Sequence, residues 1–260
     1  MPSRPSPNVG EKLVPEFLII HYTAGRSAEE SIQWFERKDS RASAHLVIAR
    51  DGGVTQQVPF NRVAWHAGQS RWMGQTGLNR CSLGIELDNA GRLARQGLRW
   101  RAWFGNEYDD NDVIEAFHKH ETTHKSGWHA FTAKQIETAL EVATLLVSKY
   151  SLKDVVGHDD ISPGRKSDPG PAFPLGSFRS KVLGRKEEEA QTYITTITLN
   201  IRIGPGTEND PLRGSPLPPG TRVEVIGEQG SWRRVDVLQE VHEVMDMSGW
   251  VHHRFLKLPE

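Results

Sequence analysis

The chain has 260 residues, and its 32 basic and 33 acidic side chains leave a formal net charge of -1. This near balance is typical of ordinary globular proteins and excludes the strongly basic surface of a nucleic-acid binder, so no nucleic-acid partner is expected. No stretch approaches the roughly 20 apolar residues of a membrane span.

Residues 1–16 contain several prolines and lack the apolar core of a secretory signal peptide. We therefore expect the chain to be made in the cytoplasm. It would stay there, or reach a cell wall by a route that needs no signal peptide, such as lysis or injection. The single cysteine, Cys81, excludes an internal disulfide and lies beside an apolar run, which predicts a small buried side chain and not a nucleophile.

Strand and helix patterns alternate from residue 17 onward. Residues 17–20 form a continuous apolar run, typical of a strand buried on both faces, and His21 follows directly. Ser27 and Glu30 have capping-box spacing, which predicts the start of a short helix.

A hairpin and a further strand are predicted next. Residues 44–50 and 54–58 flank the turn sequence 51–53, which is typical of a β-hairpin. The apolar run at residues 82–87 predicts another strand, and it holds a carboxylate, Glu86, between apolar neighbours.

The clearest helix begins at Thr132, which has Gln135 at capping-box spacing and is followed by apolar residues on one face. A short apolar run at residues 155–156 then predicts a strand that leads to His158.

The composition changes near a charged stretch at residues 185–189, after which short segments are separated by glycine and proline turns. This pattern is typical of a small all-β barrel. We expect residues 10–182 to form an α/β domain with a mixed β-sheet flanked by helices, residues 183–191 to form a linker, and residues 192–260 to form the barrel.

The segment 157–170 is dense in polar groups that could bind a metal. His158 and Asp168 are suitable ligands for a hard-to-borderline metal, and His21 at its strand end could supply a third. Two histidines and one carboxylate leave a coordination position open for water, as in catalytic zinc sites. Spacing alone does not establish a metal site, because histidines at strand ends commonly form hydrogen bonds to a loop and Asp168 could serve only to shape a turn.

Five blocks of the sequence follow one another in a recognisable order. They are residues 20–24, 43–52, 64–68, 83–87 and 157–171. In this order the blocks resemble the type-2 N-acetylmuramoyl-L-alanine amidase family. The resemblance covers roughly residues 15 to 178 and is nearest to the bacterial muropeptide-recycling branch, with phage lysozymes and peptidoglycan recognition proteins further off.

The resemblance implies that His21, His158 and Asp168 bind zinc, with Glu86 and Lys166 beside the metal. Zinc would provide a nucleophile at neutral pH. Glu86 would take the proton of the attacking water and return it to the leaving amine. Lys166 would face the oxyanion of the tetrahedral intermediate.

His45 and His66 occupy positions that the family uses beside the cleft, so the resemblance implies that they shape the substrate site. Some relatives carry a tyrosine immediately before the counterpart of His45, where this chain has Ala44. Any role of that tyrosine is absent here or is supplied by another group.

The segment between Glu86 and the clearest helix is rich in histidine and in aromatic residues. Its histidines do not predict a second metal, because only two of them would share a helix face. We expect at least half of its aromatic residues to pack in a core, with stacking on sugar rings as the alternative. The residues are His118, His120, His124 and His129, and Trp100, Trp103, Phe104 and Trp128.

The last part of the chain has recurring glycine-containing segments at residues 199–206, 220–225, 230–232 and 249–251. These segments resemble bacterial SH3-like domains, which commonly bind cell-wall peptides. A purely structural barrel is the alternative.

Together these patterns predict a zinc amidase that cleaves the bond between N-acetylmuramic acid and L-alanine of peptidoglycan. A recycling enzyme for soluble 1,6-anhydro-muropeptides is the first alternative, favoured by the missing signal peptide, although a soluble substrate would not need the barrel. A non-catalytic peptidoglycan-binding protein is less expected, because His21, His158 and Asp168 are all present.

Overall fold

The computed structural model describes residues 1–121, 123–184, 192–244 and 247–259. The chain divides into two compact units. Unit 1 comprises Met1–Glu115 and Ser126–Leu183, and unit 2 comprises Ala116–Lys125 and Gly184–Glu260. The charged stretch 185–189, on which the predicted linker was based, lies outside the described residues.

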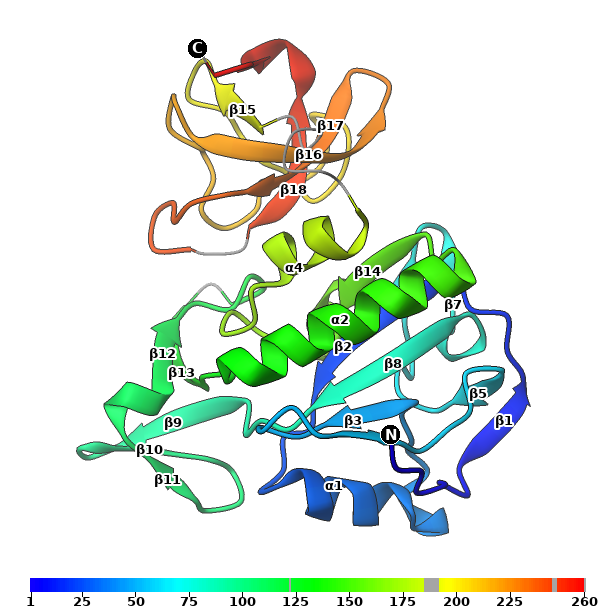
Figure 1. Ribbon diagram of the computed structural model, residues 1–260. Coiled ribbons are helices and arrows are strands. Elements are labelled where there is room, and N and C mark those ends of the chain that lie inside the picture. The colour runs from blue at the N-terminus through cyan, green and yellow to red at the C-terminus, as the bar shows by residue number, and fades with distance from the viewer. Residues whose placement is uncertain (122, 185–191, 245–246, 260) are drawn as a thin grey trace. The chain divides into compact units, whose positions relative to one another are not determined.

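Unit 1 is built on a five-stranded mixed sheet (Figure 1). Its strands are parallel except for the last, which closes the predicted hairpin. The predicted α/β class and each strand predicted for this sheet are confirmed. In spatial order the strands are β14 (Asp154–Gly157), β2 (Phe17–Tyr22), β8 (Ser82–Leu87), β3 (Leu46–Ile48) and β4 (Val54–Gln56).

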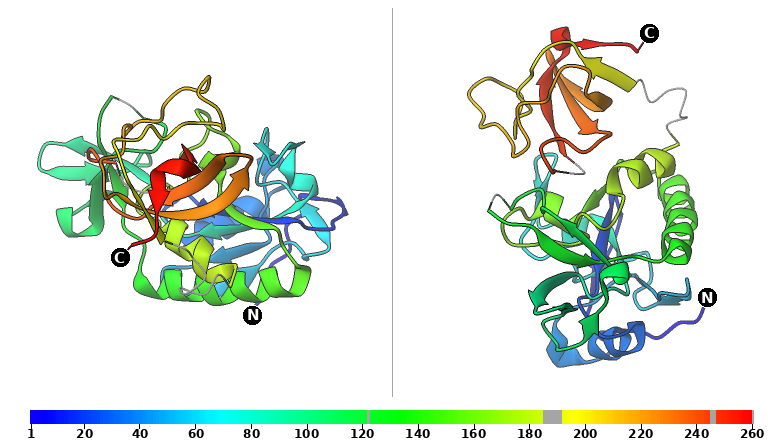
Figure 2. Two further views of the ribbon diagram at one scale, coloured as in Figure 1. Left: turned by 90° about the horizontal axis from the view of Figure 1, so that it is seen from above. Right: turned by 90° about the vertical axis from the view of Figure 1, so that its left-hand side faces the viewer.

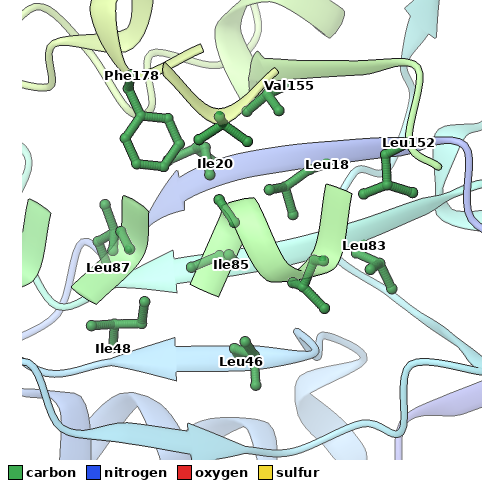
Figure 3. Packing of buried hydrophobic residues seen from close by; sticks show 14 of the residues in the cluster. Leu18, Ile20, Leu46, Ile48, Leu83, Ile85, Leu87, Leu152, Val155 and Phe178 are labelled. Carbon is green, nitrogen blue, oxygen red and sulfur yellow. The ribbon is translucent and has the colours of Figure 1, made fainter. Parts of the chain in front are cut away.

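Alternation along the central strands gives the sheet two different faces. One face carries Leu18, Ile20 and Ile85, and it forms the main core with helices α2 (Ala133–Tyr150) and α4 (Leu175–Val182). Figure 3 shows these side chains packed along the strands. The opposite face carries His21 of β2 and, in register with it, Glu86 of β8. The polar side chains therefore gather on the face that is not covered by α2.

Two helices begin as the sequence predicts. Ser27 caps α1 (Ala28–Phe35) by accepting a hydrogen bond from the Glu30 backbone, and Ile32 and Phe35 pack against Val47. Thr132 and Gln135 form the complete capping box of α2. The Gln135 side chain also donates to the Asp88 carbonyl at 2.8 Å, which anchors the start of α2 to the end of β8.

A second five-stranded sheet follows β8 and was not predicted from the sequence. Its core contains Trp100, which is 6% exposed. Trp128 is 1% exposed, and its ring lies against Gly170 on the loop that carries Asp168. Gly127 lies against the Trp100 ring, where a Cβ atom would stand 2.5 Å from the nearest ring carbon. In spatial order the strands are β11 (Glu107–Tyr108), β10 (Arg99–Arg101), β9 (Arg92–Gln96), β13 (Ser126–His129) and β12 (Val113–Ala116).

Short elements complete unit 1. Two pairs of short antiparallel strands are β1 (Val9–Lys12) with β5 (Arg62–Ala64) and β6 (Arg71–Trp72) with β7 (Gln75–Thr76). Helix α3 (His158–Ile161) follows β14, and 3-10 turns span Lys38–Ser40, Leu78–Arg80 and Asp110–Asp112. None of the helices in the described ranges combines the length and the apolar character that crossing a bilayer demands.

Unit 2 contains a curled antiparallel sheet of five strands (Figure 2). A 3-10 turn, His253–Phe255, precedes its last strand. The core includes Ile201, Leu217, Val223, Val235 and Val251. The predicted all-β character is confirmed. In spatial order the strands are β18 (Ser248–His252), β17 (Trp232–Val237), β16 (Arg222–Gln229), β15 (Thr192–Thr195) and β19 (Leu256–Lys257).

Candidate metal centre

The candidate site lies at the carboxyl ends of two neighbouring parallel strands. His21 is near the end of β2, and His158 directly follows β14 as the first residue of α3. Asp168 lies on the loop after α3, and its carbonyl accepts a hydrogen bond from the Asp159 backbone at 2.8 Å. The carboxyl edge of a parallel sheet is the usual place for a ligand site in such folds.

Three side-chain donors converge there. His21 Nδ1 and His158 Nδ1 lie 3.0 Å apart, and each is 2.9 Å from Asp168 Oδ2. Tetrahedral zinc with bonds of about 2.0 Å would separate its ligand atoms by roughly 3.3 Å. All three residues are buried. The donor atoms are therefore close to the spacing that one small divalent cation requires.

The protonation of His158 supports this interpretation. His158 Nε2 lies 3.1 Å from the Ala67 carbonyl oxygen, which can only accept, so Nε2 carries the hydrogen. In the neutral ring, Nδ1 then directs a lone pair at Asp168 Oδ2. Two lone pairs at this distance repel each other, and a cation between them removes the repulsion. The donor set thus fits a bound metal.

A chain of hydrogen bonds orients His21 in the same way. Ser82 Oγ donates to the Leu78 carbonyl at 2.7 Å, so it presents a lone pair to His66 Nε2, 3.4 Å away. His66 Nδ1 is then the acceptor, and it lies 2.9 Å from His21 Nε2. His21 therefore donates through Nε2 and directs its Nδ1 lone pair at the other two donor atoms. Such outer partners fix the tautomer and the direction of a metal-binding imidazole.

The position of His66 depends on a glycine in β8. A Cβ atom at Gly84 would stand 2.6 Å from the nearest atoms of the His66 ring, closer than real contacts allow. Only glycine lets the imidazole lie flat enough on the strand to reach His21. The glycine in the middle of this strand is therefore part of the site.

The surroundings keep His21 and Asp168 in the forms that bind metal. Burial lowers the pKa of His21 to about 4; the charge of His158 also lowers it, and Asp168 opposes both effects. Burial alone would raise the pKa of Asp168, but His158 and His21 outweigh it and hold that pKa below its usual range. A neutral imidazole and an ionised carboxylate are the states that coordinate a cation.

Glu86 is the carboxylate beside the three donors. It pairs with His21 across β2 and β8, on the same face of the sheet. Its Oε2 is buried and has no hydrogen-bond partner among the described residues. Burial, and next the charge of Asp168, raise the pKa of Glu86 well above its usual value, while Lys166 opposes them. A carboxylate with a free oxygen and a raised pKa suits a proton acceptor.

Lys166 is exposed on the loop between the ligands. Its backbone nitrogen donates to the Ser162 carbonyl at 3.1 Å. Arg165 supports the loop by donating to the Ala67 carbonyl at 2.8 Å. The charge of Lys166 acts on both His21 and Glu86, which places its ammonium group within electrostatic range of the site.

Residues 11–171 match the family model described as N-acetylmuramoyl-L-alanine amidase, which is more than half of the chain. The chain belongs to this amidase family. The matched range contains all three donors, Glu86 and Lys166, and it ends before the sheet of unit 2 begins.

Sequence similarity to individual amidases supports this assignment. N-acetylmuramoyl-L-alanine amidase AmiD of Escherichia coli (strain K12) is 32% identical over 176 residues, which are 64% of this chain and 53% of AmiD. 1,6-anhydro-N-acetylmuramyl-L-alanine amidase AmpD of the same organism is 35% identical over 149 residues, which are 56% of this chain and 61% of AmpD. The chain thus spans between half and two thirds of the length of these relatives.

A solved structure of E. coli AmiD shows the fold as well. It is a complex with the substrate anhydro-N-acetylmuramic acid-L-Ala-D-gamma-Glu-L-Lys. It aligns with a TM-score of 0.50 at 30% identity and covers 67% of this chain and 60% of its own. The mixed sheet with helices is therefore the type-2 amidase fold.

The two remaining histidines of the amidase motifs are both buried. His45 is fully buried: its Nδ1 accepts from the Gly84 backbone and its Nε2 donates to the Arg62 carbonyl, each at 3.0 Å. A direct contact of His45 with substrate is therefore not expected. The His45 ring lies 5.7 Å from the ring of His66, so any influence of His45 on the site would pass through that neighbour. Sequence reasoning placed His66 beside the cleft and missed its contact with His21.

The histidines of the inserted segment lie outside the set of three donors. His129 is buried in β13, where its Nδ1 accepts from the Ala90 backbone at 3.1 Å. His118, His120 and His124 do not lie on a helix. Within the described ranges, the one set of at least three histidine, cysteine or carboxylate donors close enough to share a metal is the set at the candidate site. Cys81 is buried in an apolar cluster, as predicted.

Proposed function

We propose that this amidase is a zinc-dependent hydrolase that cleaves the amide bond between N-acetylmuramic acid and L-alanine in peptidoglycan. The observation that carries the proposal is the convergence of two buried imidazoles and one carboxylate, with the free oxygen of Glu86 beside them. Bound zinc supplies a Lewis acid that polarises the scissile carbonyl and makes water more acidic. His21, His158 and Asp168 would hold it.

The other polar groups take roles that their surroundings favour. Glu86 accepts the proton of the attacking water at its free Oε2 and returns it to the departing amine of alanine. Its raised pKa brings its basicity closer to that of the groups with which it exchanges the proton. Lys166 faces the negative oxygen of the tetrahedral intermediate as a fixed positive charge.

We further propose that unit 2 is an SH3-like domain that binds the cell wall. Its five short antiparallel strands support this assignment, together with the glycine-rich motifs between residues 199 and 251. A wall-binding unit favours polymeric peptidoglycan as the substrate. The soluble 1,6-anhydro-muropeptide is the second candidate, because the matched AmpD proteins are named for that substrate.

One experiment compares these substrates directly. Purified protein is incubated with intact sacculi and with a soluble anhydro-muropeptide, and the products are identified by mass spectrometry, with Glu86→Gln as the control for catalysis. Release of free stem peptide from sacculi supports the main proposal, and cleavage of the soluble compound alone supports the recycling role. If zinc-loaded protein cuts neither substrate, the chain is a non-catalytic binder and the proposal is wrong.

A further inference from the structure

One tryptophan of the inserted segment is exposed at the edge of the site. Trp103 lies in the turn between β10 and β11 and is 80% exposed, whereas Trp100 and Trp128 of the same insertion are buried. Its indole Nε1 donates to the Ala24 carbonyl at 2.9 Å. Ala24 is three residues beyond His21, so this carbonyl lies within roughly 10 Å of the ligand along the chain. The exposed ring is thus attached to the loop that leaves the metal ligand.

The orientation of this ring is fixed by its surroundings. The turn is closed by two backbone hydrogen bonds, Ala102 to Asn106 and Gly105 to Ala102, each 2.9 Å. Phe104 meets Trp103 edge to face, with ring centroids 5.6 Å apart. An aromatic ring held in one orientation loses little conformational entropy when it binds a ligand.

Two arginines hold this turn in place. Arg26 donates to the Phe104 carbonyl at 3.2 Å and lies 5.5 Å from the centroid of the Phe104 ring. Its second terminal nitrogen is 3.5 Å from the Glu30 carboxylate. Arg101 donates to the Gly105 carbonyl and to the Gln96 side-chain oxygen, each at 3.1 Å. Both guanidinium groups are thus used within the protein, and the turn exposes the uncharged ring of Trp103.

We propose that Trp103 and Phe104 form a stacking platform for a sugar ring of the glycan strand beside the scissile bond. The inference rests on the proposed function, in which the muramic acid that carries the cleaved amide is joined to neighbouring sugars. A pyranose ring offers a flat face of C–H groups, which packs on an aromatic face. The platform would select glycan strands over single muropeptides.

Two substrates with the same tripeptide test the platform. One is N-acetylmuramoyl tripeptide, and the other is a tetrasaccharide of alternating N-acetylglucosamine and N-acetylmuramic acid that carries the tripeptide once. Trp103→Ala should lower kcat/KM for the tetrasaccharide by about 3- to 10-fold, mainly through KM, and leave the single sugar within about twofold. Trp103→Phe should recover most of the loss. Trp34→Ala removes a half-exposed tryptophan on α1 and should change neither value.

Other outcomes would overturn the platform. Equal losses on both substrates would mean that Trp103 only steadies the Ala24 loop. A loss that grows with peptide length at constant sugar number would assign the surface to the stem peptide.

A binding measurement keeps the two proposals separate. Calorimetry with the peptide-free tetramer of N-acetylglucosamine should show weaker binding to Trp103→Ala than to the unmodified chain. This comparison tests the stacking platform even if the unmodified chain cleaves neither substrate. Absence of cleavage would contradict the proposed function and would leave the platform to be judged by binding. Identical binding by both proteins would overturn the platform.

Discussion

His66 Nδ1 lies 2.9 Å from His21 Nε2. His66 is not itself a proposed ligand, but through this contact it is the hydrogen-bond partner of one. Because His66 Nδ1 accepts the hydrogen of His21 Nε2, the Nδ1 atom of His21 keeps its lone pair for the metal. Because the hydrogen-bond chain ends on a backbone carbonyl, the direction of each hydrogen is determined by the fold.

Replacing His66 should therefore weaken metal binding without touching a ligand. His66→Phe keeps a ring of similar size but removes the acceptor, and zinc affinity should fall by about 10- to 100-fold. His66→Asn can place an oxygen near the former Nδ1 and should retain more affinity than the phenylalanine variant. Competition with a chromophoric chelator measures both. Equal affinities in the two variants would show that the His66 contact does not orient His21.

Glu86→Gln should separate metal binding from catalysis. The substitution keeps the shape of the side chain and removes its basicity, so the zinc content should match that of the unmodified protein. Turnover of muropeptide should fall by about 10²- to 10⁴-fold, the usual contribution of general acid–base catalysis. Elemental analysis and product release by chromatography give the two readouts. Near-normal turnover would mean that another group moves the proton.

Arg179→Ala should destabilise unit 1 from a position outside the site. Arg179 of α4 makes two hydrogen bonds to Asp154 of β14, at 2.7 and 2.6 Å, and both side chains are buried. Removing the arginine leaves the buried carboxylate without its counter-charge, although Trp72 Nε1 and the Val155 backbone still donate to it. The loss should cost about 3–5 kcal/mol of the free energy of unfolding. Arg37→Ala breaks an exposed pair with Asp39, which solvent screens, and should cost much less. Urea unfolding of the two variants, side by side, checks the difference.

The stability of unit 1 should depend on pH through His129. Burial, and next the charge of Arg50, lower the pKa of His129 to about 4. The unfolded chain therefore binds a proton more readily than the folded chain between about pH 6.5 and 4. The stability is fully present above this window and is lost as the pH falls through it, by about 1–3 kcal/mol.

His129→Asn isolates this effect, because its amide oxygen can still accept from the Ala90 backbone. Urea unfolding at pH 7, 5.5 and 4.5, with a chelator present throughout, should show a shallower loss of stability in the variant than in the unmodified chain. Parallel losses in the two proteins would assign the pH dependence to other groups.

The parts of unit 1 that the sequence predicts are those with strong local signals. The strand at residues 82–87 is a continuous apolar run, and the helix after Thr132 has a complete capping box. The second sheet escaped prediction because its signals are weak. β9 exposes four of its five residues, and β10 has only three residues. Their pairing depends on the packing of Trp100 under Gly127, which is not local in sequence.

The same distinction applies to the site. The order of motifs pointed to His21, His158 and Asp168, and the structure brings these three together. The sequence could not show that His66 contacts His21, since this depends on how the loop before β8 folds over that strand. Nor could it show that His45 is turned into the interior, since this depends on its bonds to Gly84 of β8 and Arg62 of β5. A glycine within the strand, Gly84, was the available signal for a side chain lying across it.

The spacing of the three donors along the chain has a consequence for synthesis. His21 and His158 are separated by 137 positions, and Asp168 follows ten positions later. A growing chain therefore carries the first donor long before it has the other two, and the cluster cannot form until β14 has joined β2 and the loop beyond it has emerged. Metal capture would thus follow the pairing of β14 with β2, once the mixed sheet is complete. A bound metal would link β2 and β14, which are the first and the last strands of that sheet to be synthesised. A chain cut short before residue 168 would lack the third donor and could not make this link.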